Sequence, residues 1–242
     1  MSEKDLLEKY IEPKKQKKAF KQLNKGIPVQ YIIGEVDFFY CNIKVKKGVL
    51  IPRFETEELV DRLVKLINEK FGNKSIKIAD LGTGSGAIAI ALKKHVPSAT
   101  VIGYDTSLKA LKLARENAKY NNVDVTFKYK NIKTKINDKF DVVVSNPPYV
   151  SKEEIISDVV KNEPRKAIFA KDDGLKYYKK ILEYSDKITR KNFIIAFEIG
   201  YKQGNLIKQE ALKYYKKEQV EILPDLSGKD RFVFIISQNS NE

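Results

Sequence analysis

The sequence contains very little cysteine or histidine. Among its 242 residues there is one cysteine, Cys41, and one histidine, His95. A single thiol cannot form an internal disulfide framework, and one Cys with one His cannot supply the ligand set of a Cys/His metal site. We therefore expect no metal. We expect Cys41 to pack as a small apolar residue and His95 to lie at the C-terminal end of a helix.

Long hydrophobic runs are also missing. Hydrophobic residues make up 42% of the chain, which is enough for a sizeable core, but no apolar run approaches the length of a membrane span. The charged N-terminus lacks the apolar centre of a signal peptide. These absences exclude membrane proteins, so we expect a soluble, cytoplasmic protein. From its length and hydrophobic content we expect one α/β domain with a short appendage. We also expect it to be a monomer.

Charge is strongly one-sided. The formal net charge is +14, which would favour binding to a phosphate backbone through counterion release. Only six of the 46 basic residues are Arg, the residue suited to bidentate phosphate or guanine contacts, so we attribute most of the excess to solvated lysines. The densest run comprises lysines 14, 15, 17, 18, 21 and 25. It is either a solvated helix or a patch that contacts an acidic protein or RNA surface weakly.

The most informative motif is Asn-Pro-Pro-Tyr at residues 146–149. It follows the apolar run 142–144, so it should lie where a buried strand meets a loop, which is where an open α/β sheet binds its ligands. The two prolines fix φ and remove two backbone donors, so the loop is stiff and rich in acceptors. Such a loop suits a substrate that donates hydrogen bonds, for example a planar NH2 group. Taken alone, the motif could also be an ordinary Asn-Pro turn.

A glycine-rich stretch gives a second signal. Residues 80–86 read Asp-Leu-Gly-Thr-Gly-Ser-Gly between a short apolar run and a helical apolar pattern. Glycines at such a turn let the backbone approach a ligand, and the helix N-terminus offers unpaired N–H groups. Asp105 ends the next apolar run about twenty residues later, the spacing at which an acid commonly binds ribose hydroxyls. A dehydrogenase could share this loop, but its combination with residues 146–149 favours S-adenosylmethionine.

These motifs resemble the class I, Rossmann-like methyltransferases that modify amide or exocyclic amine nitrogens. Additional stretches are similar to one branch, the release-factor glutamine methyltransferases, over roughly residues 28–236. These stretches are residues 28–34, 50–57, 163–165, 173–175, 198–200 and 225–231. The resemblance implies methyl transfer from S-adenosyl-L-methionine, leaving S-adenosyl-L-homocysteine, to N5 of the glutamine in the Gly-Gly-Gln loop of a peptide chain release factor.

The resemblance also implies a set of site residues. The catalytic pair is Asn146 and Pro147, whose side-chain oxygen and backbone carbonyl would accept hydrogen bonds from the substrate NH2. The expected substrate contacts are Asn146, Pro147, Pro148, Tyr149 and Arg53. The expected cofactor contacts are Gly82, Thr83, Gly84, Ser85, Gly86, Asp105, Asn131, Ile132 and Asn146.

Three of the expected roles keep an alternative. Tyr149 either forms one wall of the pocket for the substrate amide or packs as a core ring beneath the loop. Arg53 either shapes the rim of the site or pins the hairpin to the core through a salt bridge. Glu198, at the end of a strand on the same edge, is either a supporting acceptor or a neighbour of the cofactor.

The chain departs from the family pattern at three places. Only about thirty residues precede Val29, where the family usually has a sizeable helical domain, so docking of the substrate protein is expected to be arranged differently. Phe54 stands where a second proline is usual. Asn131 lies near the place of an acid that normally faces the adenine.

Alternating apolar runs predict an α/β fold with a mostly parallel seven-stranded sheet and an antiparallel final hairpin, and the resemblance implies that this fold is Rossmann-like. The strands are expected near residues 76–81, 99–104, 123–129, 140–145, 193–198, 219–223 and 231–236. We divide the chain into a short helical N-terminal segment, residues 1–27, a β-hairpin linker, residues 28–52, and a methyltransferase domain, residues 53–242. The hairpin itself is expected between Val29 and Val49.

Two rival functions use the same residues. An adenine-N6 methyltransferase acting on DNA or RNA would employ the same pair of acceptors on an exocyclic amine, although flipping a base normally recruits extra protein surface. A ribosome- or RNA-binding protein could keep the fold without catalysis, but the intact Asn146 argues against it.

Overall fold

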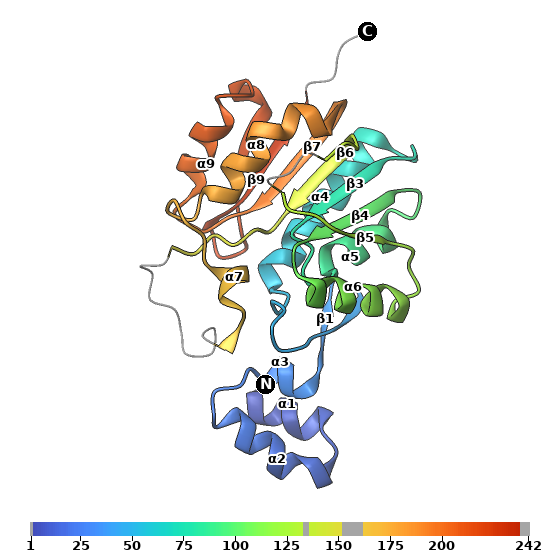
Figure 1. The fold of residues 1–242 in the computed structure, drawn as a ribbon, viewed down its shortest axis with the longest axis vertical. Helices are drawn as coiled ribbons and strands as arrows, with labels where there is room; N and C mark the ends of the chain where they lie inside the picture. Colours follow the sequence, from blue (N-terminus) through green and yellow to red (C-terminus); the bar gives the residue numbers. More distant parts are fainter. Residues whose placement is uncertain (1, 133–135, 152–161, 238–242) are drawn as a thin grey trace.

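The computed structural model describes residues 2–132, 136–151 and 162–237 (Figure 1). Its centre is a seven-stranded sheet with the strand order β5-β4-β3-β6-β7-β9-β8. The strands are β3 (Lys77–Leu81), β4 (Thr100–Asp105), β5 (Thr126–Tyr129), β6 (Phe140–Ser145), β7 (Thr189–Glu198), β8 (Val220–Pro224) and β9 (Asp230–Ile236). The parts of the predicted methyltransferase domain at 133–135, 152–161 and 238–242 lie outside the described residues.

The first five strands of this sheet run parallel, and β9 is antiparallel to both β7 and β8. The predicted fold class is therefore confirmed. One strand is longer than expected, because β7 begins at Thr189 rather than near residue 193. Its first residues, Thr189 to Asn192, are polar, so hydrophobic periodicity could not detect them. Thr189 pairs with Phe140, and the register shifts before Val142 pairs with Ile194.

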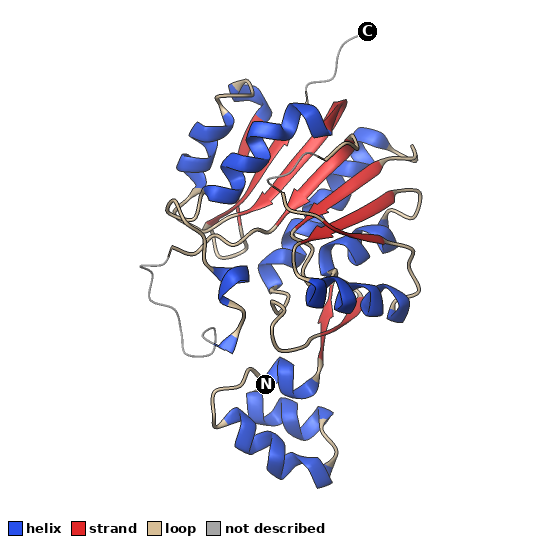
Figure 2. Cartoon of the chain, in the orientation of Figure 1, coloured by secondary structure: helices blue, strands red, loops and turns tan. Residues whose placement is uncertain are grey.

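Helices cover both faces of the sheet and make three layers (Figure 2). On one face lie α4 (Phe54–Phe71), α5 (Ala87–His95) and α6 (Leu108–Tyr120), and on the other lie α8 (Lys176–Ile188) and α9 (Gly204–Ala211). Successive residues of a strand point to opposite faces, so Val142 and Val144 join one apolar cluster and Val143 joins the other. A short helix, α7 (Arg165–Ile168), precedes α8, and a 3-10 turn, Lys217–Gln219, leads into β8.

The N-terminal part contains three helices and a two-stranded hairpin. The helices are α1 (Glu3–Tyr10), α2 (Pro13–Leu23) and α3 (Val29–Ile33), and the hairpin is β1 (Glu35–Phe38) with β2 (Cys41–Lys44). The expectation that the hairpin begins at Val29 was wrong. Val29 is buried against Leu7 and Ala19, so packing with α1 and α2 overrides the β-propensity of this segment, and Gly34 ends the helix with a φ of 97°.

The hairpin is attached to the main body through a buried side chain of α6. Asn117 is fully buried, its Oδ1 accepts from the backbone N–H of Lys44, and its Nδ2 donates to the carbonyls of Lys44 and Ser85. These bonds join β2 to the glycine-rich loop. The three-part division of the chain stays a prediction. None of the helices within the described ranges is long and apolar enough to cross a membrane.

Helix α4 forms because its apolar residues recur at three- and four-residue spacing, with Glu55 and Glu57 in the first turn. Leu63 is fully buried on its inner face. We expect Leu63→Ala to lower the free energy of unfolding by about 2–5 kcal/mol, measured by urea denaturation. The control Lys65→Ala removes a side chain that is 68% exposed and should change it by less than about 0.5 kcal/mol. Equal effects of the two substitutions would contradict this packing.

Candidate active site

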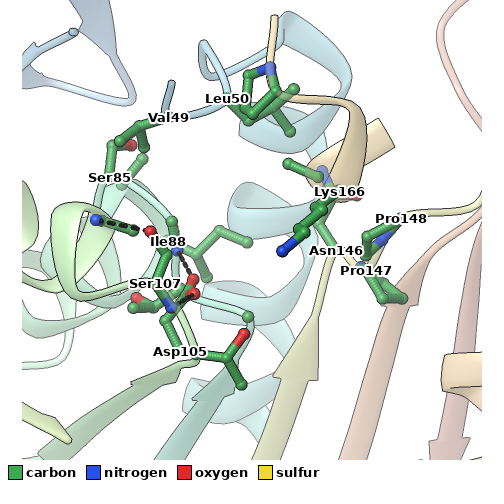
Figure 3. Close-up of a pocket in the computed structure, with 18 of the residues that line it drawn as sticks. Val49, Leu50, Ser85, Ile88, Asp105, Ser107, Asn146, Pro147, Pro148 and Lys166 are labelled. Atoms are coloured by element: carbon green, nitrogen blue, oxygen red, sulfur yellow. Dashed lines mark hydrogen bonds between the residues drawn. The ribbon is translucent and has the colours of Figure 1, made fainter. Parts of the chain in front are cut away.

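The carboxyl ends of β3, β4 and β6 meet at one edge of the sheet, because these strands are parallel neighbours. A cavity of about 560 Å³ opens there. Eleven of the predicted site residues line it: Arg53, Gly82, Thr83, Gly84, Ser85, Asp105, Asn131, Ile132, Asn146, Pro147 and Pro148. Figure 3 shows Asp105 and Ser107 on one side of the cavity, with Asn146 and Pro147 on the opposite side.

Two predicted residues do not line the cavity. Gly86 is the N-cap of α5, and a Cβ atom at this position would lie 3.0 Å from the Cβ atom of Ala114, so this glycine permits close packing of α5 on α6. Tyr149 packs against the apolar cluster under α8 and α9, as expected of a core ring beneath the loop. Direct contacts of Gly86 with the cofactor and of Tyr149 with the substrate stay predictions.

Asp105 is held by two backbone N–H groups. Its Oδ2 accepts from Gly84 at 2.9 Å and its Oδ1 accepts from Ser107 at 2.8 Å. Ser107 is also the N-cap of α6, where its hydroxyl accepts from the N–H of Ala110. The carboxylate is thereby fixed at the cavity wall, where its remaining lone pairs can accept from two ribose hydroxyls.

Sequence reasoning assigned no role to Asp80, the acid that begins the glycine-rich stretch. It is fully buried, and its Oδ2 accepts from the hydroxyl of Thr83 at 2.6 Å. Its Oδ1 has no hydrogen-bond partner among the described residues. The pKa of Asp80 is raised to about 7, mainly by burial, and the nearby charge of Asp105 acts in the same direction. Of the two acids beside the glycine loop, Asp105 lines the cavity, and its negative charge favours a cationic ligand such as S-adenosylmethionine over a pyrophosphate.

The side-chain amide of Asn146 is tied to α4. Its Nδ2 donates to Oγ1 of Thr56 at 3.1 Å, and the hydroxyl of Thr56 donates to Oε2 of Glu198 at 2.6 Å. The NH2 end of Asn146 is therefore engaged, and Oδ1 is the acceptor that this bond leaves unused. Glu198 acts here as a supporting acceptor, one of the two roles expected for it.

The backbone that follows Asn146 is also held. The hydroxyl of Tyr149 donates to Oε1 of Glu198 at 3.4 Å, and burial raises the pKa of this tyrosine. The carbonyl of Tyr149 accepts from Nε2 of Gln203, which also donates to the carbonyl of Asp173, both at 2.9 Å. Gln203 was missed by sequence reasoning, since no local motif marks it.

Arg53 forms an ion pair with the buried Glu163. Glu163 also accepts from the backbone N–H of Ile51 at 3.2 Å. The segment before α4 is thus joined to the segment before α7, and both line the cavity. The salt bridge expected of Arg53 exists, with Glu163 as its partner, and contact of Arg53 with the substrate stays a prediction.

Asp105 offers a direct test of the cofactor site. We expect Asp105→Ala to weaken S-adenosylmethionine binding about 10- to 100-fold, because hydrogen bonds to a charged group contribute about 1.5–3 kcal/mol. Isothermal titration calorimetry would measure the change. The matched control is Asp124→Ala, which removes an exposed acid before β5 and should leave the affinity unchanged. Wild-type affinity in Asp105→Ala would contradict the assigned ribose contact.

Comparison with known proteins agrees with this geometry. A family model described as the methyltransferase small domain matches residues 54–169. Among solved structures, a ribosomal protein L11 methylase from Lactobacillus delbrueckii subsp. bulgaricus has a similar fold. It aligns with a TM-score of 0.57 at 22% identity, covering 81% of this chain and 86% of that chain.

Curated relatives are more similar in sequence. The release factor glutamine methyltransferase of Streptococcus pneumoniae is 42% identical over 219 residues, which cover 89% of this chain and 77% of the relative. That of Flavobacterium psychrophilum is 42% identical over 218 residues, which cover 88% of this chain and 76% of the relative. The predicted family is confirmed: the chain belongs to the release factor glutamine methyltransferases.

Proposed function

We propose that the protein transfers a methyl group from S-adenosyl-L-methionine to the side-chain amide nitrogen, N5, of the glutamine in the Gly-Gly-Gln loop of a peptide chain release factor. The observation that carries the proposal is the orientation of Asn146. Its NH2 end is bound to Thr56, which leaves Oδ1 outside that bond, and the residue lines a cavity that also contains Asp105 and the two prolines. The names of the relatives support the same reaction.

The residues that would hold the cofactor lie on one side of the cavity. Gly82 to Ser85 would contact its methionine part, Asp105 its ribose, and Asn131 with Ile132 its adenine. When bound, S-adenosylmethionine supplies a methyl group on a positively charged sulfur. Apolar lining residues such as Val49, Leu50 and Ile88 would help to keep water out (Figure 3).

A carboxamide nitrogen is a poor nucleophile, because its lone pair is shared with the carbonyl. Acceptors at Oδ1 of Asn146 and at the carbonyl of Pro147 would hold both amide hydrogens and stabilise the positive charge that develops on nitrogen. Each contact would contribute on the order of 2–4 kcal/mol, by comparison with oxyanion-hole donors. The nitrogen would gain the methyl group, the electron pair of the broken carbon–sulfur bond would stay on sulfur, and one N–H proton would leave to solvent.

The surroundings of the reaction are part of the proposal. The exposed lysines of α2 at positions 14, 17, 18 and 21 would make weak contacts with an acidic protein surface or with RNA. Lys15 is paired with Glu12 at 2.9 Å. The protein would act as a monomer in the cytoplasm, where release factors act. The adenine-N6 alternative is not favoured by the curated relatives and is an outcome of the test below.

The test is incorporation of labelled methyl from S-adenosylmethionine into a release factor, a glutamine-to-alanine variant of its Gly-Gly-Gln loop, DNA and RNA. Label should enter only the intact release factor, and mass spectrometry should place it on the glutamine side chain. We expect Asn146→Ala to lower kcat about 100- to 1,000-fold, the effect of removing one oxyanion-hole donor, with little change in cofactor affinity.

Asn205→Ala is the matched control for this substitution, because Asn205 is exposed on α9. It should keep the wild-type rate. Label in nucleic acid alone would contradict the proposed substrate, whereas an unchanged rate in Asn146→Ala would contradict the role of that residue.

A further inference from the structure

Three side chains from separate parts of the chain form one continuous line of hydrogen bonds. Asn146 follows β6, Thr56 lies in the first turns of α4, and Glu198 ends β7. The line runs from Nδ2 of Asn146 to Oγ1 of Thr56 and from that hydroxyl to Oε2 of Glu198. Thr56 is 4% exposed and Glu198 is 1% exposed, so water does not compete for these bonds.

The bonds of this line have a fixed direction. An ionised carboxylate can only accept, so Glu198 takes the single hydroxyl hydrogen of Thr56. The Thr56 oxygen then presents only lone pairs to Asn146. An amide can meet those lone pairs only with its NH2 end, which turns its oxygen away from Thr56.

We propose that Thr56 and Glu198 are positioning residues that hold the side-chain amide of Asn146 in the one orientation that can accept from a substrate NH2 group. The inference rests on the proposed function, because it concerns the acceptor used in that reaction. Neither residue touches the reacting atoms in this assignment. Both act through Asn146.

The orientation matters because the two ends of an amide have nearly the same shape. Without the hydroxyl of Thr56, rotation of the Asn146 amide by about 180° would cost little. The rotated side chain would then present its NH2 to the NH2 of glutamine, donor against donor. That arrangement would lose the charge-stabilising contact and would hold the substrate nitrogen out of line.

The charge state of Glu198 gives the positioning role a second observable consequence, a dependence of kcat on pH. The pKa of Glu198 is raised to about 7, mainly by burial; the charge of Glu55 acts in the same direction, while Thr56, Arg231 and Tyr149 act in the opposite direction. Another polar neighbour, Tyr178, donates its hydroxyl to the backbone carbonyl of Glu198. Above this pKa the carboxylate enforces the productive direction. Below it the protonated acid can donate to Thr56 and release that constraint, so kcat should fall as pH drops through about 7.

The first test compares two substitutions of Thr56 in labelled-methyl transfer to the release factor. Thr56→Val keeps the shape but removes the hydroxyl, and kcat should fall about 10- to 100-fold with KM and cofactor affinity changed less than about threefold. Thr56→Ser keeps the hydroxyl and should restore most of the rate.

The matched control is Thr189→Val. Thr189 is also buried, and its hydroxyl donates to the carbonyl of Ser185 at 2.8 Å, at the amino end of β7 and away from the cavity. The Thr189→Val variant should lose about as much thermal stability as Thr56→Val, whereas its kcat should stay unchanged.

The second test uses Glu198→Gln, which is neutral at every pH and can donate as well as accept. The rate should fall about 10- to 100-fold at pH 8, and the decrease of kcat below about pH 7 should disappear from the pH–rate profile. If kcat of this variant still decreases below about pH 7, the titrating group is another one, such as Asp80, and the assignment of Glu198 is overturned.

The two hypotheses fail in different ways. If the wild-type protein leaves the release factor unlabelled, the proposed function is wrong and the positioning role falls with it. If the wild type labels the glutamine but Thr56→Val matches it in kcat, the proposed function stands and the positioning role is wrong. A loss of rate in Thr189→Val equal to that in Thr56→Val would show a stability effect and would also overturn the inference.

Discussion

The parallel pairing of β3 with β4 and β6 is the constraint on which the site depends. Because Asp80 pairs with Gly103 on one side and with Val144 on the other, the carboxyl ends of the three strands lie at one level. Whatever follows each strand must then gather at the same edge. The glycine loop, Asp105 and Asn146 thus meet across the cavity, although the glycine loop precedes Asn146 by about sixty residues and Asp105 precedes it by 41.

Burial of acids is the second organising feature. Asp80, Glu163 and Glu198 are each less than 5% exposed, and each would cost free energy if it were ionised without partners. The structure offsets this cost in different ways. Glu163 forms an ion pair with Arg53, and Glu198 accepts hydrogen bonds from the hydroxyls of Thr56 and Tyr149. Asp80 accepts from the hydroxyl of Thr83, and its other oxygen has no partner among the described residues.

Local motifs predicted much of the fold and many of the cavity residues. The glycine loop, Asp105 and Asn146 each carry their signal within a few residues, because strand, turn and helix start are all determined locally. The pairing of long-range partners could not be found in this way. Sequence reasoning placed Glu198 at the same edge of the sheet, but only the folded chain shows that Thr56 links it to Asn146, from 90 residues before and 52 residues after that residue. The same limit hid the helix at Val29, whose partners are on α1 and α2.

Two prolines alone do not make the catalytic loop rigid, because they restrain φ and leave the neighbouring segments free. The structure adds a clamp through Gln203, which holds the carbonyls of both Tyr149 and Asp173 and accepts from the N–H of Gly200. The fit is so close that a Cβ atom on Gly174 would lie 2.0 Å from the Tyr149 carbonyl oxygen. A stiff loop clamped in this way can present acceptors without reorganising during the reaction, which is the condition under which a few polar contacts stabilise a developing charge most strongly.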